Sequence, residues 1–136
     1  VVCRVCLGMV DWCHGLEPVS RPLVISTLGK LFGLLRSRGI LRLSVPDFKT
    51  VAELYVLRGV KLSSVFGPIM GRQDYSENTH FGIYDSESLY ALLTQVGFVN
   101  VHSYDPREVW PPEFDDYSLA IMNGRFISLN AEATRP

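Results

Sequence analysis

Short apolar runs alternate with amphipathic helical segments along this chain, and that alternation most constrains its fold. The clearest apolar run spans residues 39–46, reads Gly-Ile-Leu-Arg-Leu-Ser-Val-Pro and is closed by a proline, as strands often are. The clearest helical segment starts at Asp85 or Ser86, carries leucines at helical spacing and ends at Gly97. This order predicts an α/β fold on a mostly parallel sheet.

The first half of the chain yields three further elements. We expect a strand within residues 1–13 that ends near Trp12, and a helix that Ser20 caps and that runs to about Arg36. Gly39 would then terminate that helix. Asp47 can cap a second helix that runs to about Arg58.

The second half is more broken. Glycines and prolines punctuate residues 59–84, which predicts a long irregular loop of the kind that is often functional. We expect a strand over residues 98–104 and a polar loop over residues 105–116. Residues 117–122 and 126–129 predict a hairpin around Asn123-Gly124, which would add an antiparallel strand to the sheet edge.

Length and charge bound the class of protein. A chain of 136 residues suits a single domain, which we assign to residues 1–136, and 47% hydrophobic residues predict a packed core. A net charge of −1 gives no reason to expect a nucleic-acid partner, and no apolar run is long enough to predict a membrane span. Three cysteines crowded at one end do not make a secreted disulfide framework, so we expect a cytoplasmic protein.

Five segments carry a family resemblance when taken in order: residues 16–22, 39–48, 89–101, 115–118 and 127–130. Together they resemble class I S-adenosylmethionine-dependent methyltransferases. The first resembles the Leu-Glu-His segment after that family's fourth strand, the second its fifth strand, and the third its last helix with the sixth strand. The last two resemble the tail of a predicted-methyltransferase subgroup. The resemblance implies a partial Rossmann-like methyltransferase sandwich with a C-terminal antiparallel hairpin strand, in which only the C-terminal half of the domain is present.

The chain departs from that family where the cofactor is held. The family binds its methyl donor mainly through a glycine-rich loop after the first strand and an acidic residue at the end of the second, and we find neither here. Arg36-Ser-Arg-Gly39 also stands where Lys-Pro-Gly-Gly is usual. We therefore expect a truncated chain that binds S-adenosylmethionine weakly and is inactive in isolation.

Five residues are candidates for the site, because ligands of open α/β sheets lie beyond the carboxyl ends of the strands. The resemblance places His14 and Cys13 on the cofactor side and Asp47 and Tyr84 on the substrate side. His80 lies in the long loop and is the candidate general base, since imidazole titrates near neutral pH.

Each candidate also has a structural interpretation. His14 can be a loop histidine with a backbone partner, Asp47 a helix cap, and Tyr84 a core residue. Glu17 can cap or brace the helix that follows it.

A zinc site is the alternative for the cysteines. Cys3 and Cys6 are separated by two residues, and Cys13 is followed directly by His14. Adjacent ligands suit tetrahedral geometry poorly, and there is no second such pair, so we expect no metal. Cysteines in an apolar strand are commonly inert.

Two functions remain open. The first is a methyltransferase-like protein that uses S-adenosylmethionine and an unknown methyl acceptor. The second is a non-catalytic remnant or fragment that acts as a self-associating or partner-binding α/β module. Half a sheet exposes the edge where another strand belongs, and such an edge favours homodimerisation.

Overall fold

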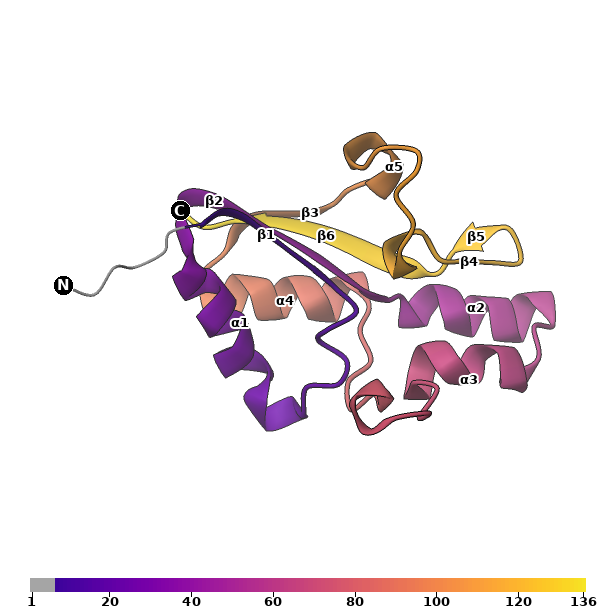
Figure 1. Ribbon diagram of the computed structural model, residues 1–136. Coiled ribbons are helices and arrows are strands. Elements are labelled where there is room, and N and C mark those ends of the chain that lie inside the picture. The colour runs from indigo at the N-terminus through magenta and orange to yellow at the C-terminus, as the bar shows by residue number, and fades with distance from the viewer. Residues whose placement is uncertain (1–6) are drawn as a thin grey trace.

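The computed structural model describes residues 7–136, which form a four-stranded sheet with helices packed against it (Figure 1). The strand order is β1-β2-β6-β3. Strands β1 (Leu7–Cys13) and β2 (Leu35–Pro46) pair in parallel, and β6 (Ser128–Thr134) pairs antiparallel to both β2 and β3 (Val99–Ser103). The predicted α/β class is confirmed.

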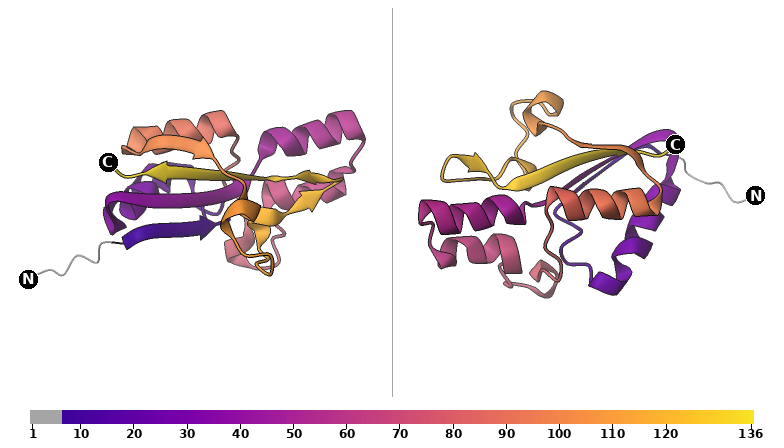
Figure 2. Two further views of the ribbon diagram at one scale, coloured as in Figure 1. Left: turned by 90° about the horizontal axis from the view of Figure 1, so that it is seen from above. Right: turned by 180° about the vertical axis from the view of Figure 1, so that it is seen from behind.

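Helices α1 (Val24–Leu34) and α4 (Ser86–Val96) lie against one face of the sheet, as Figures 1 and 2 show from opposite sides. They bury one apolar cluster against the inward side chains of β2 and β6, to which Leu28, Leu41, Leu43, Leu93 and Ala131 belong. Short α5 (Pro106–Val109) and its loop lie over the opposite face (Figure 1).

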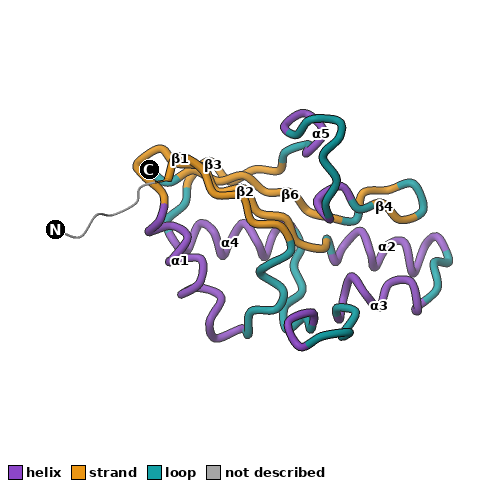
Figure 3. Tube along the Cα trace, viewed as in Figure 1, coloured by secondary structure: helices purple, strands orange, loops and turns teal. Residues whose placement is uncertain are grey.

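A second, smaller core lies beyond the carboxyl end of β2. Helices α2 (Phe48–Arg58) and α3 (Leu62–Met70) pack together there as a helical hairpin (Figure 3). Val51, Leu54 and Val65 are buried with Ile127, which precedes β6. This hairpin stands outside the sheet and forms one side of the region where a ligand would approach.

Helix α3 was not predicted, because Gly67 and Pro68 made residues 59–84 look irregular. Pro68 sits in the last turn, where its ring disturbs few backbone hydrogen bonds of so short a helix. Burial of Val65 against α2 supplies the stability that local propensity lacks. The remainder of the predicted loop, residues 71–84, is mostly irregular, with one 3₁₀ turn, Ser76–Asn78.

The predicted first helix ends too late. Leu34 is its last residue, and Leu35 already begins β2. Long-range pairing decides this boundary: the Arg38 amide donates to the Arg135 carbonyl at 2.8 Å, and the Arg135 amide donates to the Gly39 carbonyl at 2.8 Å. Gly39 is therefore a strand residue, and the expected helix cap is wrong.

The predicted hairpin is present but shorter. Strands β4 (Ile121–Met122) and β5 (Arg125–Phe126) flank Asn123 and Gly124, which both have positive φ, as a tight hairpin turn requires. The expected edge position is wrong, because β6 lies between β2 and β3. Apolar side chains on β6 align with those of β2, Leu129 with Val45 and Ala131 with Leu43, which favours the interior place.

The predicted Ser20 cap is wrong: a 3₁₀ turn, Arg21–Leu23, follows Ser20 without a side-chain capping bond, and α1 begins only at Val24. Other helix ends follow the sequence more closely. Asp85 caps α4 with a reciprocal capping box to Ser88, and Gly97 ends it in the left-handed conformation. Asp47 stands at the N-cap position of α2 and the helix ends at Arg58, as predicted, but no side-chain capping bond forms at Asp47. Gly59 follows in the left-handed conformation. Among residues 7–136, no helix combines the length and apolarity needed to cross a bilayer.

Candidate functional site

A cavity of about 730 Å³ opens where β1 and β2 end, between the strand ends and the α3 segment. That volume is in the range of small-molecule sites, and the position is the one that open α/β sheets use for ligands. Its lining includes Cys13, His14, Phe66, Pro68, Arg72, Tyr75, Asn78, His80, Met122, Tyr117, Ile127 and Ser128. Three of the five predicted residues, Cys13, His14 and His80, therefore share one cavity.

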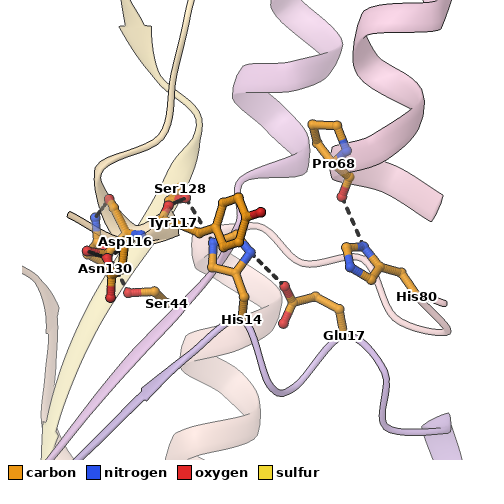
Figure 4. A network of polar contacts seen from close by, with 10 residues as sticks. His14, Glu17, Ser44, Pro68, His80, Asp116, Tyr117, Ser128 and Asn130 are labelled. Carbon is orange, nitrogen blue, oxygen red and sulfur yellow. Dashed lines mark hydrogen bonds and ion pairs between the residues drawn. The ribbon is translucent and has the colours of Figure 1, made fainter. Parts of the chain in front are cut away.

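His14 is held on every side at the end of β1 (Figure 4). Its backbone has a φ of 50°, and its amide donates to the Ser44 carbonyl at 2.8 Å, which turns the chain out of the sheet. Its Nδ1 lies 3.1 Å from Glu17 Oε1, and its Nε2 lies 3.0 Å from Ser128 Oγ. The ring packs near Tyr117 with centroids 5.5 Å apart. Neither ring nitrogen is free.

Glu17 is a buried carboxylate, with a side chain only 1% exposed. Apart from its contact with His14, its oxygens have no hydrogen-bond partner within residues 7–136. Its backbone carbonyl accepts from the amides of Phe81 at 2.7 Å and Gly82 at 3.1 Å. Glu17 thus braces the segment after His80, whereas we had expected it to brace the helix that follows it.

His80 differs from His14 in the freedom of its ring. Its Nδ1 lies 3.2 Å from the Pro68 carbonyl (Figure 4), and a carbonyl can only accept, so Nδ1 carries the proton. The ring forms no other hydrogen bond in the described part of the chain, which leaves Nε2 with its lone pair available. The His80 amide donates to the Met70 carbonyl at 3.0 Å, which ties the loop to the end of α3.

Gly71 allows His80 to reach this position. It has a φ of 76°, and a Cβ there would lie 2.0 Å from the Asn78 carbonyl oxygen and 3.2 Å from the His80 ring. Only glycine fits this backbone conformation and this close approach.

Cys13 is a neutral thiol at the cavity wall. Burial, with the nearby Asp116 carboxylate adding to it, raises the pKa of Cys13 to about 12. A thiol so reluctant to ionise is a poor nucleophile and a poor metal ligand. No group of three or more potential metal ligands occurs within residues 7–136, and Cys3 and Cys6 lie outside the described residues.

Asp47 and Tyr84 do not line the cavity. They meet in a parallel backbone bridge, and the Phe48 amide donates to the Tyr84 carbonyl at 2.9 Å. The Asp47 carboxylate accepts from the Thr50 hydroxyl at 2.7 Å. Tyr84 is 6% exposed, and burial raises its pKa. A contact of either residue with substrate stays a prediction.

Sequence reasoning missed the residues that brace the cavity from β6. The Ser44 hydroxyl donates to Asn130 Oδ1 at 2.5 Å, and Asn130 Nδ2 donates to the Ser118 carbonyl at 3.0 Å. Ser118 in turn donates to the Asp116 carboxylate from both its amide and its hydroxyl. The period-two spacing of Ser128 and Asn130 placed them on one strand face, but their partners lie more than ten residues away.

The described residues do not fit a complete S-adenosylmethionine site. No glycine-rich turn joins a strand to a helix within residues 7–136. Gly15, which follows β1, faces its own chain: a Cβ there would lie 1.9 Å from the Trp12 indole nitrogen. At Gly71 the space is filled by the Asn78 carbonyl. Gly15 and Gly71 therefore serve the packing of this chain and do not form a cofactor cradle.

Comparisons with known proteins find fold neighbours only. No family model matches the chain, and no curated protein sequence matches it. Solved structures do match. Human N-acetylserotonin methyltransferase in complex with S-adenosylmethionine aligns at a TM-score of 0.57 and 11% identity, over 94% of this chain and 29% of that one.

Two further neighbours have similar scores. An S-adenosylmethionine-dependent methyltransferase from Archaeoglobus fulgidus aligns at a TM-score of 0.54 and 12% identity, over 97% of this chain and 61% of that one. A protein from Bordetella parapertussis, described as a possible exported protein, aligns at 0.60 and 10%, over 98% of this chain and 40% of that one.

The chain thus spans between 29 and 61% of the length of these three neighbours. Identities near 10% establish the fold and nothing finer. The described residues have a partial methyltransferase fold, and the resemblance inferred from the sequence is confirmed at that level.

Proposed function

We propose that this chain supplies the methyl-acceptor side of an S-adenosylmethionine-dependent methyl transfer. The proposal rests on the position of His80. Its ring lines the cavity, Nδ1 donates to the Pro68 carbonyl, and Nε2 has no hydrogen-bond partner within residues 7–136. Of the methyltransferases that share its fold, one is in complex with S-adenosylmethionine and another is S-adenosylmethionine-dependent.

His80 is suited to accept the proton that an acceptor hydroxyl or amine loses as it is methylated. A neutral imidazole whose Nδ1–H is held by a carbonyl presents a basic Nε2 in a set direction. Cys13 does not compete for this role, because its raised pKa of about 12 keeps the thiol protonated. His14 does not compete either, because both of its nitrogens are engaged.

The acceptor would lie between apolar and polar surfaces. Phe66, Met122 and Ile127 supply apolar lining, and Arg72 and Asn78 supply polar groups at the same cavity. Binding sites for small molecules typically combine a mainly apolar lining with a few polar groups that fix orientation. S-adenosylmethionine would be held mainly by groups that residues 7–136 do not provide.

Two measurements on the intact chain test this proposal. Calorimetric titration with S-adenosylmethionine should show a Kd weaker than about 1 mM, equivalent to less than about 4 kcal/mol of binding free energy. Nuclear magnetic resonance titration with small phenols and aryl amines should shift the resonances of His80 and Tyr117. Micromolar binding of S-adenosylmethionine would contradict the proposal that this chain supplies only the acceptor side. Fragments that shift no resonance of the cavity residues would contradict an acceptor site there.

The variant His80→Gln tests the role of His80 as proton acceptor separately from its role in lining the pocket. The glutamine can still donate to Pro68, so fragment affinity should change by less than about threefold, equivalent to about 0.6 kcal/mol. The signal that reports a hydrogen bond from a phenol to Nε2 should disappear. An unchanged phenol resonance in this variant would remove His80 from the proposed role.

A specific feature also favours the second candidate, self-association. Within the described residues β1 pairs only with β2, so its outer edge offers unpaired backbone groups over seven residues. Asp11 is the only charged residue of β1, and an edge strand with so few charges is poorly protected against pairing with another strand. A second copy is the proposed occupant.

The sequence of β1 favours one register. Antiparallel pairing of two copies centred on Val10 sets Met9 opposite Asp11 and Gly8 opposite the large Trp12, whereas centring on Asp11 opposes two like charges. Met9→Asp should therefore weaken the dimer and Met9→Lys should maintain or strengthen it. With two symmetric pairs of about 0.2–1 kcal/mol each, the dimer Kd should differ by about twofold to thirtyfold. Sedimentation that shows only monomer in every variant would exclude this candidate.

A further inference from the structure

Four residues from three segments, the loop after β1, the turn Tyr117–Leu119 and β6, form one continuous chain of polar contacts at the cavity. Glu17 Oε1 lies 3.1 Å from His14 Nδ1, His14 Nε2 lies 3.0 Å from Ser128 Oγ, and Ser128 Oγ lies 2.6 Å from the Tyr117 carbonyl (Figure 4). The chain begins at a buried carboxylate and ends at an aromatic residue that lines the cavity.

Counting protons fixes the direction of both hydrogen bonds in this chain of contacts. The Tyr117 carbonyl can only accept, so the single hydroxyl proton of Ser128 points to it. Ser128 Oγ must then accept from His14, so Nε2 carries a proton. The remaining contact, between Nδ1 and Glu17 Oε1, is an approach to 3.1 Å without hydrogen-bond geometry. A bare Nδ1 lone pair would repel the buried carboxylate at that distance, so the pair needs one more proton.

That last proton belongs to His14. A carboxylic acid ordinarily releases its proton more readily than an imidazolium does. Glu17 is 1% exposed and its oxygens have no hydrogen-bond partner within residues 7–136, so a cationic His14 at 3.1 Å is what balances its charge. The pair is then an imidazolium and a carboxylate, neutral as a whole.

We propose that Glu17 is a positioning residue, which through His14 and Ser128 fixes Tyr117 as a wall of the cavity. Glu17 does not line the cavity itself and acts only through its neighbours. The Tyr117 ring packs 5.5 Å from the His14 ring, so the charged imidazolium also attracts the aromatic face. The meaning of this wall for an acceptor rests on the proposed function, but the relay does not.

The wild-type protein provides the first test. In a chain labelled with ¹⁵N-histidine, both ring nitrogens of His14 should carry protons at neutral pH, whereas His80 should show one protonated nitrogen. A His14→Gln variant assigns the signals. A wild-type His14 with an unprotonated Nδ1 would overturn the proposal.

Glu17→Gln tests the source of the charge. The glutamine amide can donate to Nδ1, so the Nδ1 proton should be lost while the Nε2 proton and the contact with Ser128 remain. Glu53→Gln is the matched control, because Glu53 is an exposed carboxylate on α2 paired with Arg125. It should leave both His14 nitrogens unchanged. An unaltered Nδ1 in Glu17→Gln would show that Glu17 only fills space.

Ser128→Ala tests the link to Tyr117. The turn Tyr117–Leu119 loses its anchor, so hydrogen exchange of the Ser118 and Leu119 amides should speed up about fivefold to tenfold, as for loss of one hydrogen bond. Ser63→Ala is the control, because Ser63 lines the same cavity from α3. Equal exchange in both serine variants would contradict the relay. None of these readouts uses a methyl donor or acceptor, so their outcome is separate from that of the methyl-transfer proposal.

Discussion

The cavity has two walls of different construction. The strand-end wall consists of Cys13, His14, Tyr117 and Ser128, and the helix-loop wall consists of Phe66, Arg72, Asn78 and His80. In the first wall, hydrogen bonds join side chains that are far apart in sequence, such as His14 and Ser128, which are 114 residues apart. In the second wall, the side-chain hydrogen bonds join residues close in sequence, as between Asn78 and Asp74.

This difference assigns the two walls different roles. Groups whose hydrogen bonds are all made within the protein can shape a ligand site but have little left to offer a ligand. The Arg72 guanidinium and Nε2 of His80 have no hydrogen-bond partner within residues 7–136, so both are available to a ligand. We infer that the strand-end wall sets the form of the cavity and the helix-loop wall provides recognition and proton transfer.

The largest expected effect is on the chemistry of Cys13. At pH 8, a thiol with a pKa of about 12 has roughly a thousandth of the thiolate fraction of an ordinary cysteine. The reason is that this fraction falls about tenfold for each unit by which the pH lies below the pKa. Alkylation of Cys13 should therefore be about a thousandfold slower in the folded than in the urea-unfolded chain, measured by mass spectrometry of its peptide. Asp116→Asn should speed it, and equal rates in folded and unfolded chains would mean that this wall is open.

A matched pair of asparagines measures the stability of each wall. Asn130→Ala leaves the buried Ser44 hydroxyl and Ser118 carbonyl without partners and should cost about 2–3 kcal/mol. Asn78→Ala removes only an exposed contact with Asp74 and should cost less than about 0.5 kcal/mol. Urea midpoints compare the two, and equal losses would erase the distinction between the walls.

Gly71→Ala challenges the view that the helix-loop wall is loosely built. The φ of 76° and the clash with the Asn78 carbonyl should cost about 1–3 kcal/mol and displace the His80 resonances. Gly124→Ala is the control, because Gly124 has a φ of 75° but open space around its Cα, and it should cost about 1 kcal/mol. Unmoved His80 signals in Gly71→Ala would show that Gly71 does not position that ring.

The smallest effect is expected at Arg72. The side chain is exposed and forms no ion pair within the described residues, so Arg72→Ala should change the free energy of unfolding by no more than about 0.5 kcal/mol. Thermal unfolding measures this. A loss above 1 kcal/mol would mean that Arg72 braces the wall and is not available to a ligand.

Much of the fold could be predicted from local patterns. Asp85 and Gly97 bound α4, Asp47 and Gly59 bound α2, and Asn123-Gly124 forms the turn. Caps and tight turns depend on residues within one turn of the chain, so the sequence carries them directly. The resemblance to methyltransferases, drawn from several ordered segments, agrees with the fold neighbours.

The site was predicted less completely. Cys13, His14 and His80 meet at one cavity, and Asp47 and Tyr84 pair beside it without lining it. Ser128 and Tyr117 carried no local signal, since a serine and a tyrosine in predicted strands are ordinary residues until their partners are known. Whether these residues act in methyl transfer stays a prediction for all of them.

The sequence by itself determined the cap of α4, the tight turn, the α/β class and the end of the sheet at which the cavity opens. Tertiary structure alone decided that Leu35 leaves the helix for β2, that β6 enters the middle of the sheet, and that α3 forms around Pro68. It also decided which histidine keeps a free nitrogen. The reason is physical: periodicity and capping are properties of neighbouring residues, whereas strand pairing and the placement of a proton depend on groups that only folding brings together.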